Sequence, residues 1–272
     1  MMQPSLFDEP QPARWRVVED YTPVHKMEGG VWVKRDDLYG AYGAPGGKAR
    51  TCLRIAMAHR GKTLVTAGSR GSPQVHIVAL IAKGLGVACR VHVPAAKQSY
   101  PELELARELG AEVVEHRPGY NSVIAARAKA DAINTGAAHI PFGMECVEAV
   151  EETAGQCGNL PVHAARIVVP VGSGMSLAGI IRGVAAKFLA PIPILGVVVG
   201  ASPTKRLDKY APHWRNYCTL VRPQEGYSMP AKHTSWWGIE LDPHYEAKAA
   251  PFVKPGDLFW VVGIRPRLQP DG

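Results

Sequence analysis

The chain has 272 residues, of which 46% are hydrophobic, and this is enough for one large or two small domains with a sizeable core. It contains no run of about 18 apolar residues and no apolar signal-peptide core, so we expect neither a membrane span nor a secretory leader. The formal net charge of +7 favours anionic partners such as a phosphorylated cofactor or a carboxylate substrate. The basic residues are scattered along the sequence, which makes nucleic acid the less favoured partner.

Cysteine and histidine usage argues against disulfides and metals. The five cysteines are widely spaced and form no C-x-x-C pair, and the ten histidines show no H-x-x-x-H or H-E-x-x-H arrangement. We therefore expect reduced thiols, a cytoplasmic location and no metal site.

Residues 1–14 form a proline-rich stretch that predicts a flexible tail. Within it, Gln3 to Phe7 (Gln-Pro-Ser-Leu-Phe) resembles the short Gln-x-x-Leu-Phe peptide by which some bacterial proteins dock on the sliding clamp. Five residues match easily by chance, and a Leu-Phe pair can also anchor a tail to its own domain. The anchoring interpretation is preferred, and the clamp contact is kept as an alternative.

A lysine after two glycines is the first candidate for chemistry. Residues 31–37 predict a short strand that runs into a polar turn, and residues 51–58 have the apolar spacing of a helix. Lys48 therefore sits at a helix start, where backbone N–H groups are unpaired and the helix dipole disfavours the ammonium form. Such a lysine is a candidate nucleophilic amine that can form a Schiff base with an aldehyde.

Two other interpretations of Lys48 compete with this one. A phosphate-binding P-loop needs a glycine at Tyr42 and Ser or Thr at Ala49, and the sequence has neither. A surface lysine after a turn would be the better interpretation if Gly-Gly-Lys stood alone, but a second motif lies downstream.

Regular alternation of strand and helix follows Lys48. The predicted strands are residues 63–67, 88–94, 111–115 and 139–141, and the predicted helices are residues 75–82, 103–109 and 121–132. Strands separated by helices of this length predict βαβ units around a parallel sheet. We place a small domain at residues 51–145, inserted in a large domain of residues 15–50 and 146–272.

The second motif reads strand, glycine-rich turn and helix over residues 166–182. Gly172, Ser173, Gly174, Met175 and Ser176 predict a turn whose backbone amides point at an anion. The next strand, residues 192–200, ends in Ala-Ser where a dinucleotide fold would carry an acid. A mononucleotide or a small phosphorylated cofactor therefore fits better than NAD.

Together the two motifs resemble a known family. A Lys-Arg-Asp-Asp strand (Lys34–Asp37) leading to Gly-Gly-Lys-x-Arg, with a later Pro-Val-Gly-Ser-Gly-x-Ser-Leu-Ala-Gly turn, is similar to the fold-type II pyridoxal-phosphate enzymes, the tryptophan synthase β-subunit superfamily. The nearest branch is that of the aminocyclopropane-carboxylate deaminases and D-cysteine desulfhydrases. The resemblance implies an α/β fold of two three-layer, parallel-sheet domains with the cofactor cleft between them. It also implies pyridoxal 5′-phosphate (PLP) bound to Lys48, a cofactor phosphate held by residues 172–176, and a homodimer.

The turn at residues 69–74 falls where the family carries a Ser-x-Asn-His or Ser-Asn-His loop that grips the substrate carboxylate and the cofactor. Ser72 matches the serine, while Pro73 and Gln74 replace Asn-His. By the resemblance, Ser72 is a catalytic candidate and Gln74 a cofactor-binding candidate. A helix cap, with Ser72 at the N-cap and Pro73 at the first helical position, is equally compatible.

The C-terminal region departs from the family. Val262 stands where this branch carries a threonine that meets the pyridine nitrogen, and valine cannot form that hydrogen bond. Glu240 is a candidate to point toward the cofactor, with a solvated cap as the preferred alternative. Tyr227 is a candidate second acid or base. The Trp236–Trp237 pair can stack on a planar substrate, but packing against the core is preferred.

The sequence therefore predicts a PLP-dependent enzyme that acts on an amino acid or amine by elimination, deamination or related chemistry. One alternative is an enzyme of the same kind acting on an aminoacylated nucleotide or a modified DNA base. Another is a binding protein that has kept the fold and lost catalysis.

Overall fold

The computed structural model describes residues 21–263 except 99, 189 and 191, and the chain divides into two compact units. Unit 1 contains residues 40–145, and unit 2 contains residues 21–39 and 146–263. The predicted tail, residues 1–14 with the clamp-like Gln3 to Phe7, lies outside the described residues.

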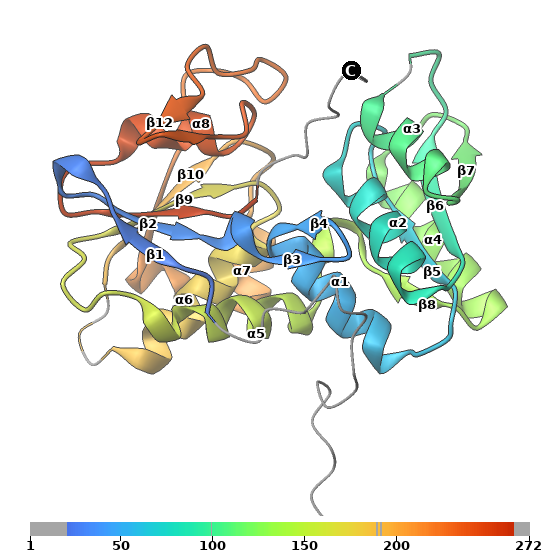
Figure 1. The fold of residues 1–272 in the computed structure, drawn as a ribbon, viewed down its shortest axis with the longest axis horizontal. Coiled ribbons are helices and arrows are strands. Elements are labelled where there is room, and N and C mark those ends of the chain that lie inside the picture. Colours follow the sequence, from blue (N-terminus) through green and yellow to red (C-terminus); the bar gives the residue numbers. More distant parts are fainter. Residues whose placement is uncertain (1–20, 99, 189, 191, 264–272) are drawn as a thin grey trace, which may run out of the picture. The chain divides into compact units, whose positions relative to one another are not determined.

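Unit 1 is built around a parallel sheet of four strands in the order β7-β6-β5-β8 (Figure 1). The strands are β5 (Leu64–Ala67), β6 (Cys89–Pro94), β7 (Glu112–His116) and β8 (Ala138–Ile140). The helices are α1 (Gly46–Ala58), α2 (Pro73–Leu85), α3 (Pro101–Glu108) and α4 (Asn121–Thr135). Helix α4 covers one face, where Val65 and Ala67 pack against it, and α2 covers the other, with α1 and α3 beside it. The predicted βαβ alternation is confirmed.

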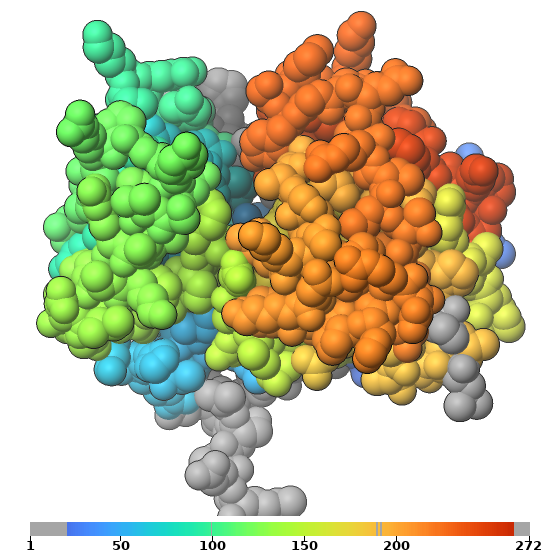
Figure 2. All heavy atoms as spheres, turned by 180° about the vertical axis from the view of Figure 1, so that it is seen from behind, coloured from blue at the N-terminus to red at the C-terminus, as the bar shows by residue number. Residues whose placement is uncertain are grey.

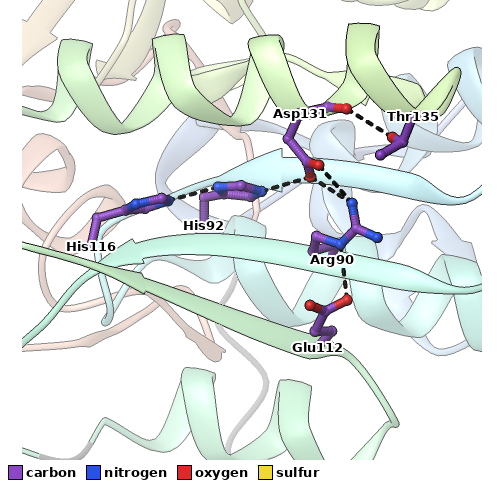
Figure 3. Close-up of polar contacts among 6 residues, drawn as sticks. All are labelled: Arg90, His92, Glu112, His116, Asp131 and Thr135. Carbon is purple, nitrogen blue, oxygen red and sulfur yellow. Dashed lines mark hydrogen bonds and ion pairs between the residues drawn. The ribbon is translucent and has the colours of Figure 1, made fainter.

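A polar network fastens α4 to the edge strand β7 and to its neighbour β6 (Figure 3). Asp131 on α4 accepts two hydrogen bonds of 2.7 Å from Arg90 of β6, and it lies 3.0 Å from Nε2 of His92. Nδ1 of His92 lies 2.8 Å from Nε2 of His116 at the end of β7. Glu112, at the start of β7, pairs with Arg90. Since His92 is almost fully buried, the network replaces apolar packing in this layer.

Unit 2 contains a six-stranded sheet in the order β1-β2-β14-β9-β10-β11, parallel except for β1. The strands are β1 (Val24–Lys26), β2 (Trp32–Arg35), β9 (Ile167–Val171), β10 (Ile194–Val198), β11 (Cys218–Val221) and β14 (Leu258–Val261). The helices are α5 (Val147–Gly155), α6 (Met175–Lys187), α7 (Thr204–Tyr210) and α8 (Glu246–Ala249), and a ribbon is formed by β12 (Ser235–Trp236) and β13 (Ile239–Glu240). The last strand, β14, lies between β2 and β9, so distant parts of the chain meet at the centre of the sheet.

The Lys-Arg-Asp-Asp stretch has a structural role in unit 2. The side chain of Lys34 is fully buried, and its Nζ donates to the carbonyl of Thr22 at 2.7 Å and to Asn159 at 2.7 Å. Arg35 pairs with the buried carboxylate of Asp37 at 2.7 Å. These contacts hold the strand β2 and the turn after it in place.

The domain boundary differs from the predicted one. Residues 40–50 belong to unit 1, whereas the sequence placed them in the large domain. A short hairpin of β3 (Gly40–Ala41) and β4 (Ala44–Pro45) leads into α1, which packs on α2. The ring of Tyr42 lies so close to Gly84 of α2 that a Cβ there would be 2.1 Å from its Cγ. The boundary therefore follows Tyr39, and Lys48 belongs to unit 1.

Three further expectations can be compared with the structure. Trp236 and Trp237 pack against the core cluster of unit 2, which confirms the packing interpretation. All five cysteines are free thiols. Within the described part of the chain, no helix is both long and apolar enough to cross a bilayer.

Candidate cofactor site

The glycine-rich turn of unit 2 connects the end of β9 to the start of α6, as predicted. Gly174 has a φ of +92°, and a Cβ at this position would lie 2.7 Å from Cβ of Pro203. A Cβ at Gly172 would lie 2.8 Å from Cε1 of Tyr245. Both positions therefore require glycine, and the backbone can approach a ligand closely there. The amides of the first turn of α6, Met175 and Ser176 among them, follow directly and suit a phosphate group.

A pair of tyrosines lies beside this turn. The ring of Tyr245 packs against Gly172, and its hydroxyl lies 3.0 Å from the hydroxyl of Tyr227. The side chain of Tyr227 is 49% exposed. The structure thus brings Tyr227 close to the glycine-rich turn through Tyr245. Tyr245 was not predicted from the sequence as a site residue; it lies in the stretch Asp-Pro-His-Tyr-Glu-Ala-Lys at residues 242–248.

Glu246 is a buried acid next to this pair. Its Oε1 accepts hydrogen bonds of 3.2 Å from the amides of Val262 and Gly263, whereas its Oε2 has no hydrogen-bond partner among the described residues. Burial, and after it the negative charge of Asp242, raises the pKa of Glu246 well above its usual value. The carboxyl group therefore keeps its proton to higher pH than an ordinary glutamate, and Oε2 can donate that proton in a hydrogen bond.

Val262 contributes its backbone to this arrangement, which the sequence did not predict. The valine was expected to leave a cofactor nitrogen without a donor, but the backbone amide of Val262 instead donates to a buried carboxyl group whose pKa is raised. Glu240, the acid selected from the sequence, accepts a hydrogen bond from Thr234 across the β12–β13 ribbon. The observed orphan oxygen of Glu246 fits a group with a basic ring nitrogen, and the glycine turn in the same unit fits its phosphate.

Lys48 and Ser72 both lie at helix starts in unit 1. Lys48 is in the first turn of α1, which begins at Gly46, and it is half-buried. Ser72 is the N-cap of α2 and accepts a hydrogen bond of 3.3 Å from the amide of Gln74, with Pro73 at the first helical position. The predicted helix start at Lys48 and the helix cap at Ser72 are confirmed.

Gln74 has a structural role that the sequence analysis did not predict. Its side-chain amide nitrogen donates to the hydroxyl of Thr66 at 2.9 Å and to the carbonyl of Pro141 at 2.8 Å, and its oxygen accepts from the amide of Gly143 at 2.9 Å. The residue is 1% exposed. These bonds fasten the loop after β8 to β5, and they favour this role over the predicted contact with a cofactor.

Comparison with known proteins identifies the family. The family model described as pyridoxal-phosphate dependent enzyme matches residues 17–216. The chain belongs to this family. Within it, the chain has the α/β fold of the fold-type II, tryptophan synthase β-like enzymes, and PLP is the cofactor that membership implies.

Two curated proteins are similar to this chain. The O-seryl-dTMP PLP-dependent decarboxylase of Salmonella phage ViI is 24% identical over 340 residues, which cover 88% of this chain and 79% of the phage protein. The 1-aminocyclopropane-1-carboxylate deaminase of Rhizobium radiobacter is 29% identical over 196 residues, which cover 64% of this chain and 58% of the deaminase.

Solved structures show the same fold. A crystal structure of an ACC deaminase homologue matches with a TM-score of 0.75 at 22% identity and covers 96% of this chain and 95% of its own. The L-serine ammonia-lyase of Rhizomucor miehei matches with a TM-score of 0.66 at 16% identity and covers 90% of this chain and 93% of its own.

Proposed function

We propose that this protein is a PLP-dependent enzyme of the lyase or deaminase type that acts on an amino acid or amine. The observation that carries the proposal is the family match, because it spans both Lys48 at the start of α1 and the glycine turn before α6. Lys48 is the residue that bonds to the aldehyde of PLP, and the amides of residues 172–176 bind its phosphate.

Each of these groups has a defined task. Bound PLP supplies the electron sink that weakens bonds at the α-carbon of the substrate. The carboxyl of Glu246 would donate a hydrogen bond to the ring nitrogen of the cofactor, since its raised pKa favours the protonated form and its Oε2 has no hydrogen-bond partner among the described residues. Lys48 would also hold and move the proton at the α-carbon of the substrate. Ser72 is proposed to meet the substrate carboxylate, and Tyr227 is proposed as a second acid or base.

An absorption experiment tests the proposal. The purified chain should take up PLP and show a visible band that borohydride removes, and Lys48→Ala should show none. Lys62→Ala, an exposed lysine after the same helix, is the matched control and should behave as wild type. Protein that takes up no PLP would favour the non-catalytic alternative. Ammonia with a 2-oxo acid, or carbon dioxide with an amine, as products from a panel of amino acids would then identify the reaction.

A second candidate function is chemistry on an amino acid attached to a nucleotide. The phage ViI relative, whose name gives O-seryl-dTMP as its substrate, aligns with 88% of this chain, more than the deaminase relative does. Release of carbon dioxide from an O-seryl-thymidine oligonucleotide, with no turnover of free serine, would support this candidate. Turnover of free amino acids alone would exclude it.

A homodimer is also proposed, because the enzymes that this chain resembles are commonly dimers. Light scattering of the purified protein measures the mass directly, and a monomer at micromolar concentration would contradict it.

A further inference from the structure

The turn that carries Ser72 connects β5 to α2 in unit 1. It is closed by the amide of Ser72, which donates to the carbonyl of Ser69 at 2.9 Å. A Cβ at Gly68 would lie 2.7 Å from Cγ1 of Val75, so the chain folds back directly on the start of α2. The turn follows the carboxyl end of a parallel strand, which is the edge of such a sheet where ligands bind.

The side chain of Arg70 fixes the middle of this turn. Arginine side chains are mostly exposed in proteins, but Arg70 is only 7% exposed. Its Nη1 donates to Oε1 of Glu115 on β7 at 2.8 Å and to the carbonyl of Pro94 at the end of β6 at 3.4 Å. The side chain therefore joins the turn after β5 to the two strands that follow on that side of the sheet.

Glu115 is held as an ionised acceptor. The hydrogen bond from Arg70 lowers the pKa of Glu115, so its carboxylate stays charged at neutral pH. Arg107 on α3 donates to the same oxygen at 3.1 Å, but it is exposed on the segment from α3 to α4, which forms much of the green surface of unit 1 in Figure 2. Since exposed ion pairs contribute little, the shorter bond from the buried Arg70 is the one that determines the path of the turn.

Two further contacts limit the movement of the turn. Gly71 lies against the ring of Tyr100, where a Cβ would be 2.9 Å from Cδ1. On the other side, Gln74 is bonded to the loop after β8. The turn is therefore fixed on both sides, by Arg70 toward β7 and by Gln74 toward β8.

The hydroxyl of Ser72 remains available to a ligand. It accepts the hydrogen bond from the amide of Gln74 and makes no other hydrogen bond with a described residue. Because a hydroxyl is both a donor and an acceptor, its proton can be donated to a carboxylate. Such a donor recognises a carboxylate well only if the backbone that carries it is fixed.

Stability alone does not account for Arg70. Its Nε is buried and has no hydrogen-bond partner among the described residues, and a buried donor without an acceptor destabilises the folded state. A buried apolar side chain in the same place would avoid this cost. What Arg70 supplies, and an apolar side chain would not, is a directed bond from the turn to Glu115.

We propose that Arg70 is a positioning residue for the proposed reaction, and that it holds the turn at residues 69–72 through Glu115 so that Ser72 meets the substrate carboxylate. This inference rests on the proposed function, since that function assigns the carboxylate to Ser72. In this role Arg70 acts through the turn and not by contact with the substrate.

Hydrogen exchange of the PLP-free protein, followed by mass spectrometry, tests whether Arg70 holds the turn. Arg70→Met keeps a long side chain and removes the hydrogen bonds, and Glu115→Ala removes their acceptor. The matched control is Arg107→Met, which removes the other arginine on the same carboxylate. The first two variants should exchange faster in the peptide of residues 68–75, and the control should match the wild type. Wild-type exchange of this peptide in Arg70→Met, or equal acceleration throughout unit 1, would overturn the inference.

Kinetics of the PLP-loaded protein test the role in the reaction, with the substrate that product analysis identifies. Arg70→Met and Glu115→Ala should each raise KM about 10-fold and leave kcat within about 2-fold, because a displaced turn weakens binding of the carboxylate. The double variant should be no worse than either single variant, and Arg70→Lys should lie between wild type and Arg70→Met. An unchanged KM, a change in kcat alone, or additive effects would overturn the inference. Failure to take up PLP, or to turn over any free or nucleotide-linked amino acid, would instead contradict the proposed function, while the exchange measurement still decides whether Arg70 holds the turn.

Discussion

Replacing Glu246 by glutamine tests whether the buried acid of unit 2 carries a proton. Glutamine has the same shape and no charge. Its side-chain oxygen can accept the same hydrogen bonds from the amides of Val262 and Gly263, which lie 3.2 Å from Oε1 in the wild type. Its NH2 group takes the place of Oε2, which has no hydrogen-bond partner among the described residues. If the wild-type carboxyl is protonated, the two side chains are nearly equivalent.

The effect of pH on stability has a definite sign. Because the pKa of Glu246 is raised in the folded state, its contribution to stability is complete below the unfolded pKa of about 4.3 and is lost as pH rises toward the folded value. The free energy of unfolding of the wild type should therefore fall, relative to that of the variant, by up to about 1.4 kcal/mol per pH unit over this range. At about pH 4.5 the two proteins should differ by less than ~1 kcal/mol, since the same hydrogen bonds are present in both.

Urea unfolding of the cofactor-free proteins between pH 4.5 and about 8.5 measures this difference. The exposed Glu225, changed to glutamine, is the matched control for the loss of one carboxyl group in the same unit. Glu246→Gln should become more stable than wild type as pH rises. A variant that is less stable by ~3 kcal/mol or more at neutral pH would refute the reasoning, because it would mean that the charged carboxylate stabilises the fold.

Three further predictions concern the turn, the buried amide and the polar network. Gly174→Ala should lower the free energy of unfolding by about 2–4 kcal/mol and weaken PLP binding, since a φ of +92° and contact with Pro203 both oppose a side chain. The control is Gly256→Ala, where φ is +88° and the nearest atom to an added Cβ is 3.4 Å away. It should lower the free energy of unfolding by about 1–2 kcal/mol and leave the PLP affinity, measured by titration, unchanged. Gln74→Ala should lower the melting temperature, because the buried polar groups that Gln74 contacts lose their partner. The cofactor absorption band should stay at the same wavelength. A shifted band would instead support the predicted contact between Gln74 and the cofactor. Burial, and after it the charges of His92 and Arg127, lowers the pKa of His116. The wild type should therefore lose stability as pH falls below about 6.5, and His116→Gln should reduce this loss in a plot of unfolding free energy against pH. The same pH dependence in both proteins would contradict this.

Local sequence patterns were enough to predict the parallel sheets and the local structure of the two motifs, whereas the fold type came from the family resemblance. Alternating strands and helices specify parallel sheets, and Lys48 and the turn at residues 172–176 each depend only on their neighbours in the chain. The helix cap at Ser72 is local in the same sense. These are the parts in which the structure agrees with the sequence.

The parts that were missed depend on contacts between distant residues. Glu246 is a buried acid with a raised pKa, and it is held by the amide of Val262 only because β14 returns to the centre of the sheet. Gln74 has its role because Thr66 and Pro141 meet it in three dimensions. The assignment of residues 40–50 to unit 1 likewise follows from packing on α2, which no periodicity reveals.

Reduction of the PLP-loaded protein with borohydride, followed by peptide mapping, is the most direct measurement of the central claim. The account predicts that the pyridoxyl group is found on Lys48, in the peptide that contains the start of α1. A modified lysine elsewhere, such as Lys34 or Lys248, or no modification of a protein that has taken up PLP, would contradict it.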